Sequence, residues 1–240
     1  MTATDRPAAL AAVEDLVAVM DRLRSPGGCP WDAAQTHASL LPYAVEEVYE
    51  VVEAVENDDR TALCEELGDL LLQVVFHARV AQEHPTEPFG LAEVAAGVAA
   101  KLRHRHPHVF GDAVVADAED VHRRWEEIKK AEKGRASVLD GVPAGLPALA
   151  RAQKVVGRAH RAGLVVDAAG GQPAVGTPAE RIGGLLLSLV REAEAAGVDA
   201  EAALRAAIRD LDAEVRDAEV RDAEVKGAED GTGRGRDGRE

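Results

Sequence analysis

Two short acidic clusters interrupt apolar stretches of the chain and carry the residue types with the clearest capacity for chemistry. The first has the pattern Glu-Glu-x-x-Glu and begins at Glu46, and the second has the pattern Glu-x-x-Asp and begins at Glu66. Valine, leucine and alanine surround both clusters, which favours helices that carry carboxylates on or beside their buried face. Because like charges at this spacing destabilise a helix and buried carboxylates are costly unless compensated, the pattern indicates a site.

A hard divalent cation held by oxygen ligands would compensate the repulsion between these carboxylates. The carboxylates that share a helix face are Glu46, Glu47, Glu50 and Glu53 in the first helix, and Glu66 and Asp69 in the second. Mg²⁺ fits better than Zn²⁺ or iron, since neither cluster contains histidine or cysteine at a matching spacing. The alternative is two solvated faces of an acidic protein. Such faces usually mix charges, whereas Arg60 is the only basic residue between Tyr43 and His77.

Basic and aromatic residues that could contact a phosphorylated substrate follow later in the chain. Mg²⁺ sites of this kind usually bind through substrate phosphates, and Lys101 and Arg105 lie one helical turn apart. Those charges could instead only complement the dipole of a helix end. Trp125 and Lys129, also one turn apart, could supply an aromatic surface and a phosphate contact, or a core residue and a lysine packed along it. Trp31 could contact a base or shape a turn.

Helices must position these residues, and the apolar spacing predicts five of them in the first half of the chain. The predicted ranges are 8–24, 39–56, 60–83, 91–106 and 120–133. The turn Asn57-Asp58-Asp59 separates the two acidic helices and doubles as an N-terminal cap. Helices joined by so tight a turn lie antiparallel, which brings Glu50 and Glu66 towards the same end of the pair.

Composition supports an all-α protein and limits its partners. The chain has 240 residues, of which 46% are hydrophobic and only 3% aromatic, which favours helices packed by small aliphatic side chains. A net charge of −15 argues against general binding of nucleic acids or anionic membranes. We expect a cytoplasmic protein, because no apolar run is long enough to span a membrane and the first residues lack a signal-peptide pattern. The two cysteines suggest neither a disulfide framework nor a zinc site.

The second half of the chain repeats part of the first without its acidic residues. Segment 180–187 follows the pattern of 65–72, but Arg181 and Gly184 stand at the positions of the second acidic cluster. A five-residue repeat covers 212–226, and because five is not a helical period we expect a frayed helix that passes into disorder. The predicted organisation is a catalytic domain at 1–135, a Gly/Pro/Ala-rich connector at 136–178, a degenerate second copy at 179–227 and a disordered tail at 228–240.

The ordered set of motifs resembles the MazG family of nucleoside triphosphate pyrophosphohydrolases. The resemblance covers residues 10–133 and includes the two acidic clusters, 28–32, 105–110 and 125–129. It implies an antiparallel helix bundle completed by homodimerisation, and Mg²⁺-dependent cleavage of nucleoside triphosphates to monophosphates and pyrophosphate. The residues that it implies as metal ligands are Glu47, Glu50, Glu66 and Asp69. The residues that it implies as nucleotide contacts are Lys101, Arg105, Trp125 and Lys129.

The expected chemistry is metal-assisted hydrolysis between the α and β phosphates, and the expected role is to cleanse the nucleotide pool. A carboxylate free of metal, Glu46 or Glu53, is the candidate proton acceptor. Two other functions remain open. A di-iron bundle would also place acids on facing helices, but it requires Glu-x-x-His pairs that the clusters lack. A non-catalytic helical dimer could bind nucleotides or a protein partner as a regulator.

Overall fold

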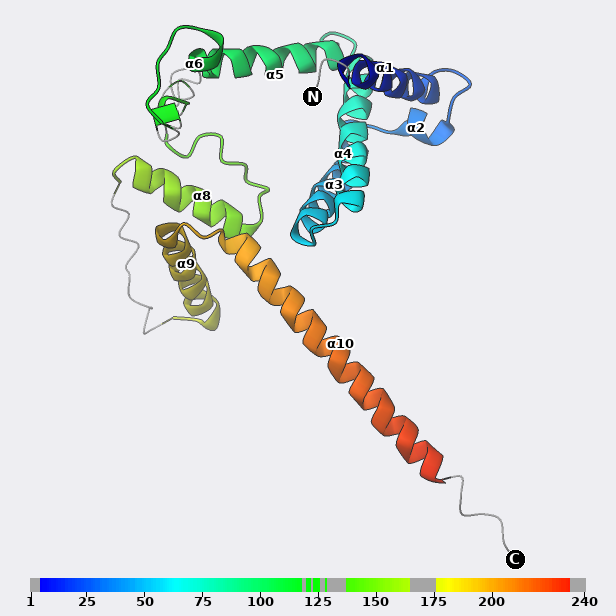
Figure 1. Ribbon diagram of the computed structural model, residues 1–240, viewed down its shortest axis with the longest axis vertical. Coiled ribbons are helices and arrows are strands. Elements are labelled where there is room, and N and C mark those ends of the chain that lie inside the picture. The colour runs from blue at the N-terminus through cyan, green and yellow to red at the C-terminus, as the bar shows by residue number, and fades with distance from the viewer. Residues whose placement is uncertain are drawn as a thin grey trace, which may run out of the picture. The chain divides into compact units, whose positions relative to one another are not determined.

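The computed structural model describes residues 5–117, 120–121, 123–125, 128, 137–164 and 176–233. Within these ranges the regular secondary structure is entirely helical, which confirms the predicted all-α class (Figure 1). The chain divides into two compact units, Met1–Lys129 and Lys130–Glu240. None of the described helices combines the length and the apolar character needed to cross a bilayer.

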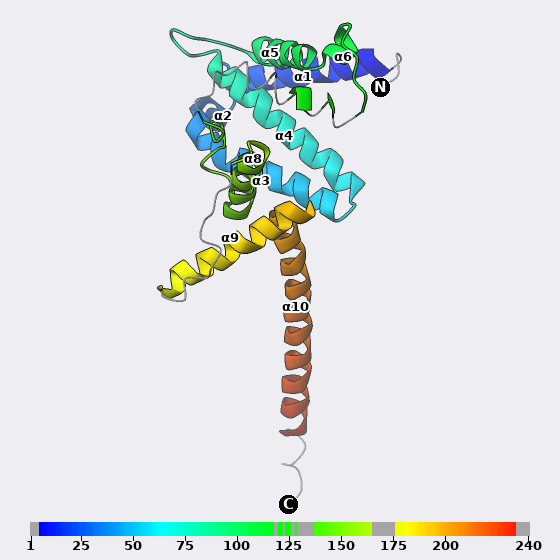
Figure 2. The ribbon, with the colours of Figure 1, turned by 90° about the vertical axis from the view of Figure 1, so that its left-hand side faces the viewer.

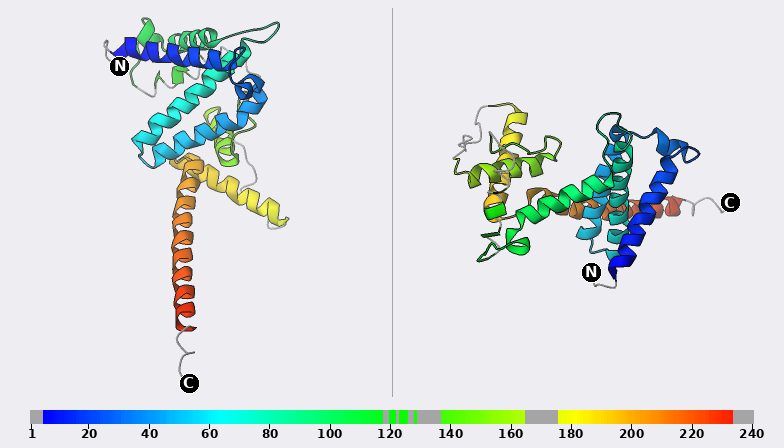
Figure 3. Two further views of the ribbon diagram at one scale, coloured as in Figure 1. Left: turned by 90° about the vertical axis from the view of Figure 1, so that its right-hand side faces the viewer. Right: turned by 90° about the horizontal axis from the view of Figure 1, so that it is seen from above.

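The first unit contains the two acidic helices and the elements that hold them. Its helices are α1 (Asp5–Arg24), α2 (Pro30–Ala34), α3 (His37–Glu56), α4 (Arg60–Ala81), α5 (Leu91–Arg105) and α6 (Pro107–Phe110). α3 and α4 lie side by side and run in opposite directions (Figures 2 and 3). Residues 120–121, 123–125 and 128 are also helical, in agreement with the predicted fifth helix at 120–133. The other residues of that range lie outside the described residues.

Side-chain caps set the register of the two acidic helices. The Thr36 hydroxyl accepts a hydrogen bond from the Ser39 backbone N–H at 3.2 Å, so α3 begins two residues before the predicted start. Asp58 then adopts a left-handed conformation with φ 54° in the turn between α3 and α4. The Asp59 carboxylate accepts from the backbone N–H groups of Thr61 and Ala62 and caps α4.

A small core holds α1 and the start of α3 against the second half of α4. Met20, Leu40, Val75 and Phe76 are buried, with exposed fractions of 4% or less. The packing fixes the carboxyl-terminal half of α4 and the first turn of α3, and the acidic clusters lie further along the same pair of helices. The site is therefore carried by rigid elements and not by a loop.

The second unit is built from α8 (Ala148–Arg161), α9 (Pro178–Ala196) and α10 (Ala200–Gly233). α8 packs on both α9 and α10, and Val190 of α9 is 1% exposed. Gln153 of α8 donates to the carbonyl of Val198 at 2.6 Å and accepts from the N–H of Ala200 at 2.9 Å, which fixes the turn between α9 and α10. α9 carries the degenerate copy of the α4 pattern predicted from the sequence.

The α10 helix continues to Gly233, through the five-residue repeat and past the frayed end that we expected there. The repeat places an aspartate four residues before each basic residue, in the orientation that stabilises a helix best. The Asp222 carboxylate and the Lys226 ammonium lie 2.5 Å apart as one such pair. A pair at this spacing stabilises a helix locally, even where the apolar period does not match 3.6 residues.

Candidate functional site

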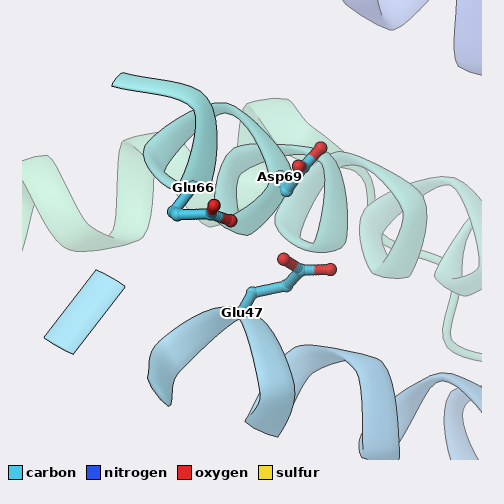
Figure 4. A group of neighbouring side chains, drawn as sticks. All are labelled: Glu47, Glu66 and Asp69. Carbon is cyan, nitrogen blue, oxygen red and sulfur yellow. The ribbon is translucent and has the colours of Figure 1, made fainter. Parts of the chain in front are cut away.

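Three carboxylates from α3 and α4 converge to form what we call the carboxylate cluster: Glu47, Glu66 and Asp69. One oxygen from each lies within 4.8 Å of the others, and all three residues are half-buried. Glu47 points from α3 towards the two acids of α4 (Figure 4). The spacing of three residues puts Glu66 and Asp69 on one face of α4, and the antiparallel pairing brings that face to α3.

Glu50, the fourth predicted ligand, is exposed at the edge of the cluster. Its carboxyl group lies close enough to interact with those of Glu47 and Glu66. Desolvation, followed by repulsion from Asp69 and Glu50, raises the pKa of Glu47. Desolvation, followed by repulsion from Glu50, Glu65 and Asp69, raises the pKa of Glu66. The carboxylates therefore repel one another, and a bound cation would relieve that repulsion.

The donor set of the carboxylate cluster fits a hard divalent cation. All three ligand groups are carboxylates, and no histidine or cysteine joins such a group anywhere in the part of the chain that the structure describes. Oxygen-only sites suit Mg²⁺, Mn²⁺ or Ca²⁺ better than Zn²⁺. A di-iron centre of the bundle type requires histidine ligands, and the cluster offers none. A buried amide oxygen without a partner, on Gln73 beside the cluster, is a further sign of a missing ligand.

The two candidate proton acceptors lie outside the carboxylate cluster. Glu46 and Glu53 are exposed, and they share one face of α3 with Glu50 because the three residues follow the spacing i, i+4 and i+7. Neither residue belongs to the group whose oxygens converge. They are thus placed beside the cluster and remain accessible to water.

Trp31 lies against α3 one turn before the carboxylate cluster. Its ring meets that of Tyr43 edge to face, with centroids 6.1 Å apart, and Tyr43 precedes Glu47 by four residues. Trp31 nevertheless keeps 52% of its surface exposed. An aromatic face beside the carboxylates could stack on a base, so this position is compatible with the predicted base contact.

The basic residues of α5 do not approach the carboxylate cluster within one chain. α5 contacts α4 and α6 but not α3 in the described part of the structure, and it runs about 21 Å from Leu91 to Arg105. Figure 1 shows its far end directed away from α3 and α4. The Arg105 guanidinium lies over the Trp125 ring, 5.6 Å from its centroid, while Lys101 is exposed. Lys129 lies outside the described residues.

Two residues next to the carboxylate cluster escaped the sequence analysis. Tyr43 packs on Trp31, and the side chain of Gln73 interacts with that of Glu47. Both could have been found from spacing, because Tyr43 lies one turn before Glu47 and Gln73 one turn after Asp69. Their neutral side chains carry no charge pattern, so they resemble ordinary residues of a helix–helix interface.

Residues 35–110 match the family model of the MazG nucleotide pyrophosphohydrolase domain. An uncharacterised 26.1 kDa protein from Streptomyces cacaoi is 52% identical over 80% of this chain and 76% of its own length. The nucleoside triphosphate pyrophosphohydrolase/pyrophosphatase MazG of Thermotoga maritima is 39% identical over 82% of this chain and 81% of its own length.

A third relative matches a smaller share of both chains. The nucleoside triphosphate pyrophosphohydrolase of Escherichia coli (strain K12) is 46% identical over 63% of this chain, and the match spans 59% of that relative. The matched family domain contains α3, α4 and α5 and hence both acidic clusters. The Thermotoga maritima relative is itself named MazG and is matched over most of its length and most of this chain. This chain therefore belongs to the MazG family.

Proposed function

We propose that this chain is a hydrolase that cleaves nucleoside triphosphates, ribo or deoxy, to the monophosphate and pyrophosphate in a Mg²⁺-dependent reaction. The observation that carries the proposal is the carboxylate cluster, whose oxygens converge within 4.8 Å on two antiparallel helices. Membership of the MazG family supports the substrate class, because several relatives are named nucleoside triphosphate pyrophosphohydrolases.

Glu47, Glu66 and Asp69 would hold the cation, and Glu50 would complete the set by a rotation of its exposed side chain. When bound, Mg²⁺ supplies charge neutralisation on the phosphate oxygens and activation of water. The half-buried position of the three carboxylates strengthens their interaction with a cation, because fewer water molecules screen it.

The remaining residues take roles that follow from their positions. Glu46 or Glu53, exposed beside the cluster, would accept the proton of the attacking water. Lys101, Arg105 and Lys129 would hold the triphosphate and stabilise charge on the departing pyrophosphate.

The nucleotide base would pack on aromatic side chains. Trp31 stands against Tyr43 with half of its surface free, and Trp125 packs under Arg105.

We also propose that the active form is a homodimer. The far end of α5 does not reach the carboxylate cluster of its own chain, so a neighbouring copy is the simplest source of the basic residues. Large apolar side chains are exposed on α3 and α4, including Val45, Val48, Leu67 and Leu71. Exposed apolar faces of this kind are typical of helices that pack against a partner.

A panel of canonical and damaged triphosphates, incubated with the full chain and Mg²⁺, tests the activity. We expect pyrophosphate and the monophosphate as products, and loss of pyrophosphate release to background in Glu50→Gln and Asp69→Asn with helix content unchanged. A preference for damaged nucleotides would support a role in cleansing the nucleotide pool.

The matched control is Glu14→Gln, which neutralises an exposed acid on α1 and should leave turnover unchanged. Release of orthophosphate in place of pyrophosphate would contradict the proposed site of cleavage. A nucleotide-dependent rise in melting temperature without any turnover would favour the non-catalytic binding module instead.

A further inference from the structure

Gln73 is a buried amide that extends the line of polar residues on α4 from the carboxylate cluster towards the core. It follows Asp69 by four residues and Glu66 by seven, so the three side chains share one face of α4. Its exposed fraction is 8%, although its neighbours Val75 and Phe76 show that this level of the helix also buries apolar residues. An apolar residue would therefore satisfy packing at this position.

The NH₂ group and the Oε1 atom of the Gln73 amide have different surroundings. The side chains of Gln73 and Glu47 lie close enough to interact, and because a carboxylate accepts hydrogen bonds from an amide NH₂ group, we place the NH₂ group towards Glu47. The other end, Oε1, is buried and has no hydrogen-bond partner. A buried carbonyl oxygen without a donor costs free energy, since it has given up hydrogen bonds to water.

Gln35 provides an internal comparison, since it is buried to nearly the same extent, with an exposed fraction of 9%. Its Nε2 donates to the carbonyl of Trp31 at 3.0 Å, and its Oε1 accepts from the Ser39 hydroxyl at 2.6 Å. Both ends of that amide are satisfied within the protein. Gln73 differs because its Oε1 is buried without a partner, in a residue on the face of α4 that also carries Glu66 and Asp69.

We propose that Gln73 is a positioning residue of the metal site, which holds Glu47 through its NH₂ group and offers Oε1 to a water molecule that enters with the cation. The inference rests on the proposed function, because it assumes that the carboxylate cluster binds a divalent cation. In that state the water donates to Oε1 and the amide is satisfied at both ends. The unpartnered Oε1, which is unfavourable in the free protein, thus gains a hydrogen bond in the cation complex.

The amide would act on the site in two ways. Donation from the NH₂ group would orient the Glu47 carboxylate towards Glu66 and Asp69. Acceptance by Oε1 would orient a water molecule that enters with the cation. Residues that hold ligands in this manner typically change metal affinity by about 10–100-fold when they are removed.

Mn²⁺ binding to the full chain, followed by electron paramagnetic resonance, tests the role of Gln73 without any measurement of turnover. The test variant is Gln73→Met, which keeps the length of the side chain and removes both polar ends. We expect its Kd for Mn²⁺ to rise about 10–100-fold. The melting temperature of the metal-free variant should stay equal to that of the wild type or rise, because the unpartnered oxygen is gone.

The matched control is Gln35→Met, which should show the opposite behaviour. Loss of two satisfied hydrogen bonds should lower its melting temperature by roughly 2–4 °C or more and leave the Kd for Mn²⁺ unchanged. Gln73→Leu serves as a second test variant with the same expected loss of affinity if Gln73→Met does not fold.

Equal Mn²⁺ affinity of Gln73→Met and the wild type would overturn the role of Gln73 and leave the proposed function standing. A fall in melting temperature without a change in affinity would likewise assign Gln73 to packing alone and overturn the inference. Failure of the wild type to bind Mn²⁺ would overturn the metal site itself, and the inference with it.

Discussion

The imidazole rings of His37 and His77 form a hydrogen-bonded pair at the start of α3. Their Nδ1 atoms are 2.8 Å apart, their planes differ by 4°, and their centroids are 5.1 Å apart. The centroid separation exceeds the Nδ1 separation by about two ring radii, so the rings lie edge to edge and share one hydrogen bond. One Nδ1 donates and the other accepts, which is impossible when both rings are protonated.

This pair predicts that stability falls as the solution becomes mildly acidic. Burial, followed by repulsion from His37, lowers the pKa of His77, so the unfolded chain binds more protons than the folded chain just below the ordinary histidine value of about 6.5. The free energy of unfolding should therefore be fully retained above that pH and decline below it. Urea denaturation of the wild type and of His77→Phe, measured between pH 5 and 7.5, checks the slope.

The slope should be shallower in His77→Phe, while His160→Phe, which replaces an exposed histidine on α8, should behave as the wild type. A slope of the same size in both variants would show that His77 does not cause the pH dependence.

At the scale of the elements, Arg24 joins the end of α1 to α2, to the start of α3 and to the end of α4. Its guanidinium makes two hydrogen bonds of 2.9 Å to Glu83 and donates to the carbonyls of Asp32 and Gln35 at 2.6 and 3.0 Å. The side chain is only 6% exposed and lies 6.0 Å from the centroid of Phe76. A planar fork with several donors is required, and lysine cannot reproduce it.

Arg24→Lys should therefore lower the free energy of unfolding by about 2–3 kcal/mol, since one ammonium group cannot reach two carbonyls and both oxygens of a carboxylate together. The hydrogen bonds and charge of Arg24, together with Arg79, lower the pKa of Glu83. The wild type should thus lose this stabilisation as the pH falls below the ordinary glutamate value, and the variant should be less sensitive to acid. Urea denaturation at neutral and acidic pH measures both effects.

Arg22→Lys, at an exposed position on α1, provides the comparison and should stay within about 0.5 kcal/mol of the wild type. If both lysine variants lost equal stability, the network around Arg24 would not be the cause.

At the scale of the whole molecule, the exposed apolar residues of α4 favour self-association. Leu67, Leu71 and Val74 follow the spacing i, i+4 and i+7 and are 51%, 38% and 41% exposed. A continuous apolar stripe on a helix is usually covered by another surface. The proposed homodimer would cover it and bring basic residues from a second copy.

The double variant Leu67→Lys/Leu71→Lys should therefore be monomeric, because two ammonium groups cannot be buried in an apolar interface without partners. Analytical ultracentrifugation at micromolar concentration distinguishes it from a dimeric wild type. Val220→Lys on α10 replaces a valine that is 59% exposed and should leave the oligomeric state unchanged. A monomeric wild type, or a double variant that still forms dimers, would contradict the proposed interface.

Much of the local structure was predictable from the order of residues alone. The helical spacing of Leu, Val and Ala, the Asn57-Asp58-Asp59 turn and the acidic patterns predicted two antiparallel helices with carboxylates at one end. The structure confirms the all-α class, and its α3 and α4 follow this plan. Helix propensity and capping depend on neighbours within a few residues, so the sequence contains this information directly.

The convergence of side chains was decided by tertiary structure. From their spacing along α3, Glu47 and Glu50 are equally good candidates for metal ligands. The packing of α3 against α4 places Glu47 among the converging oxygens and leaves Glu50 exposed at the edge of the cluster. The same packing buries Gln73 with a free acceptor and keeps the basic end of α5 away from the acids. Helix crossing geometry depends on side chains far apart in the chain, and no local pattern encodes it.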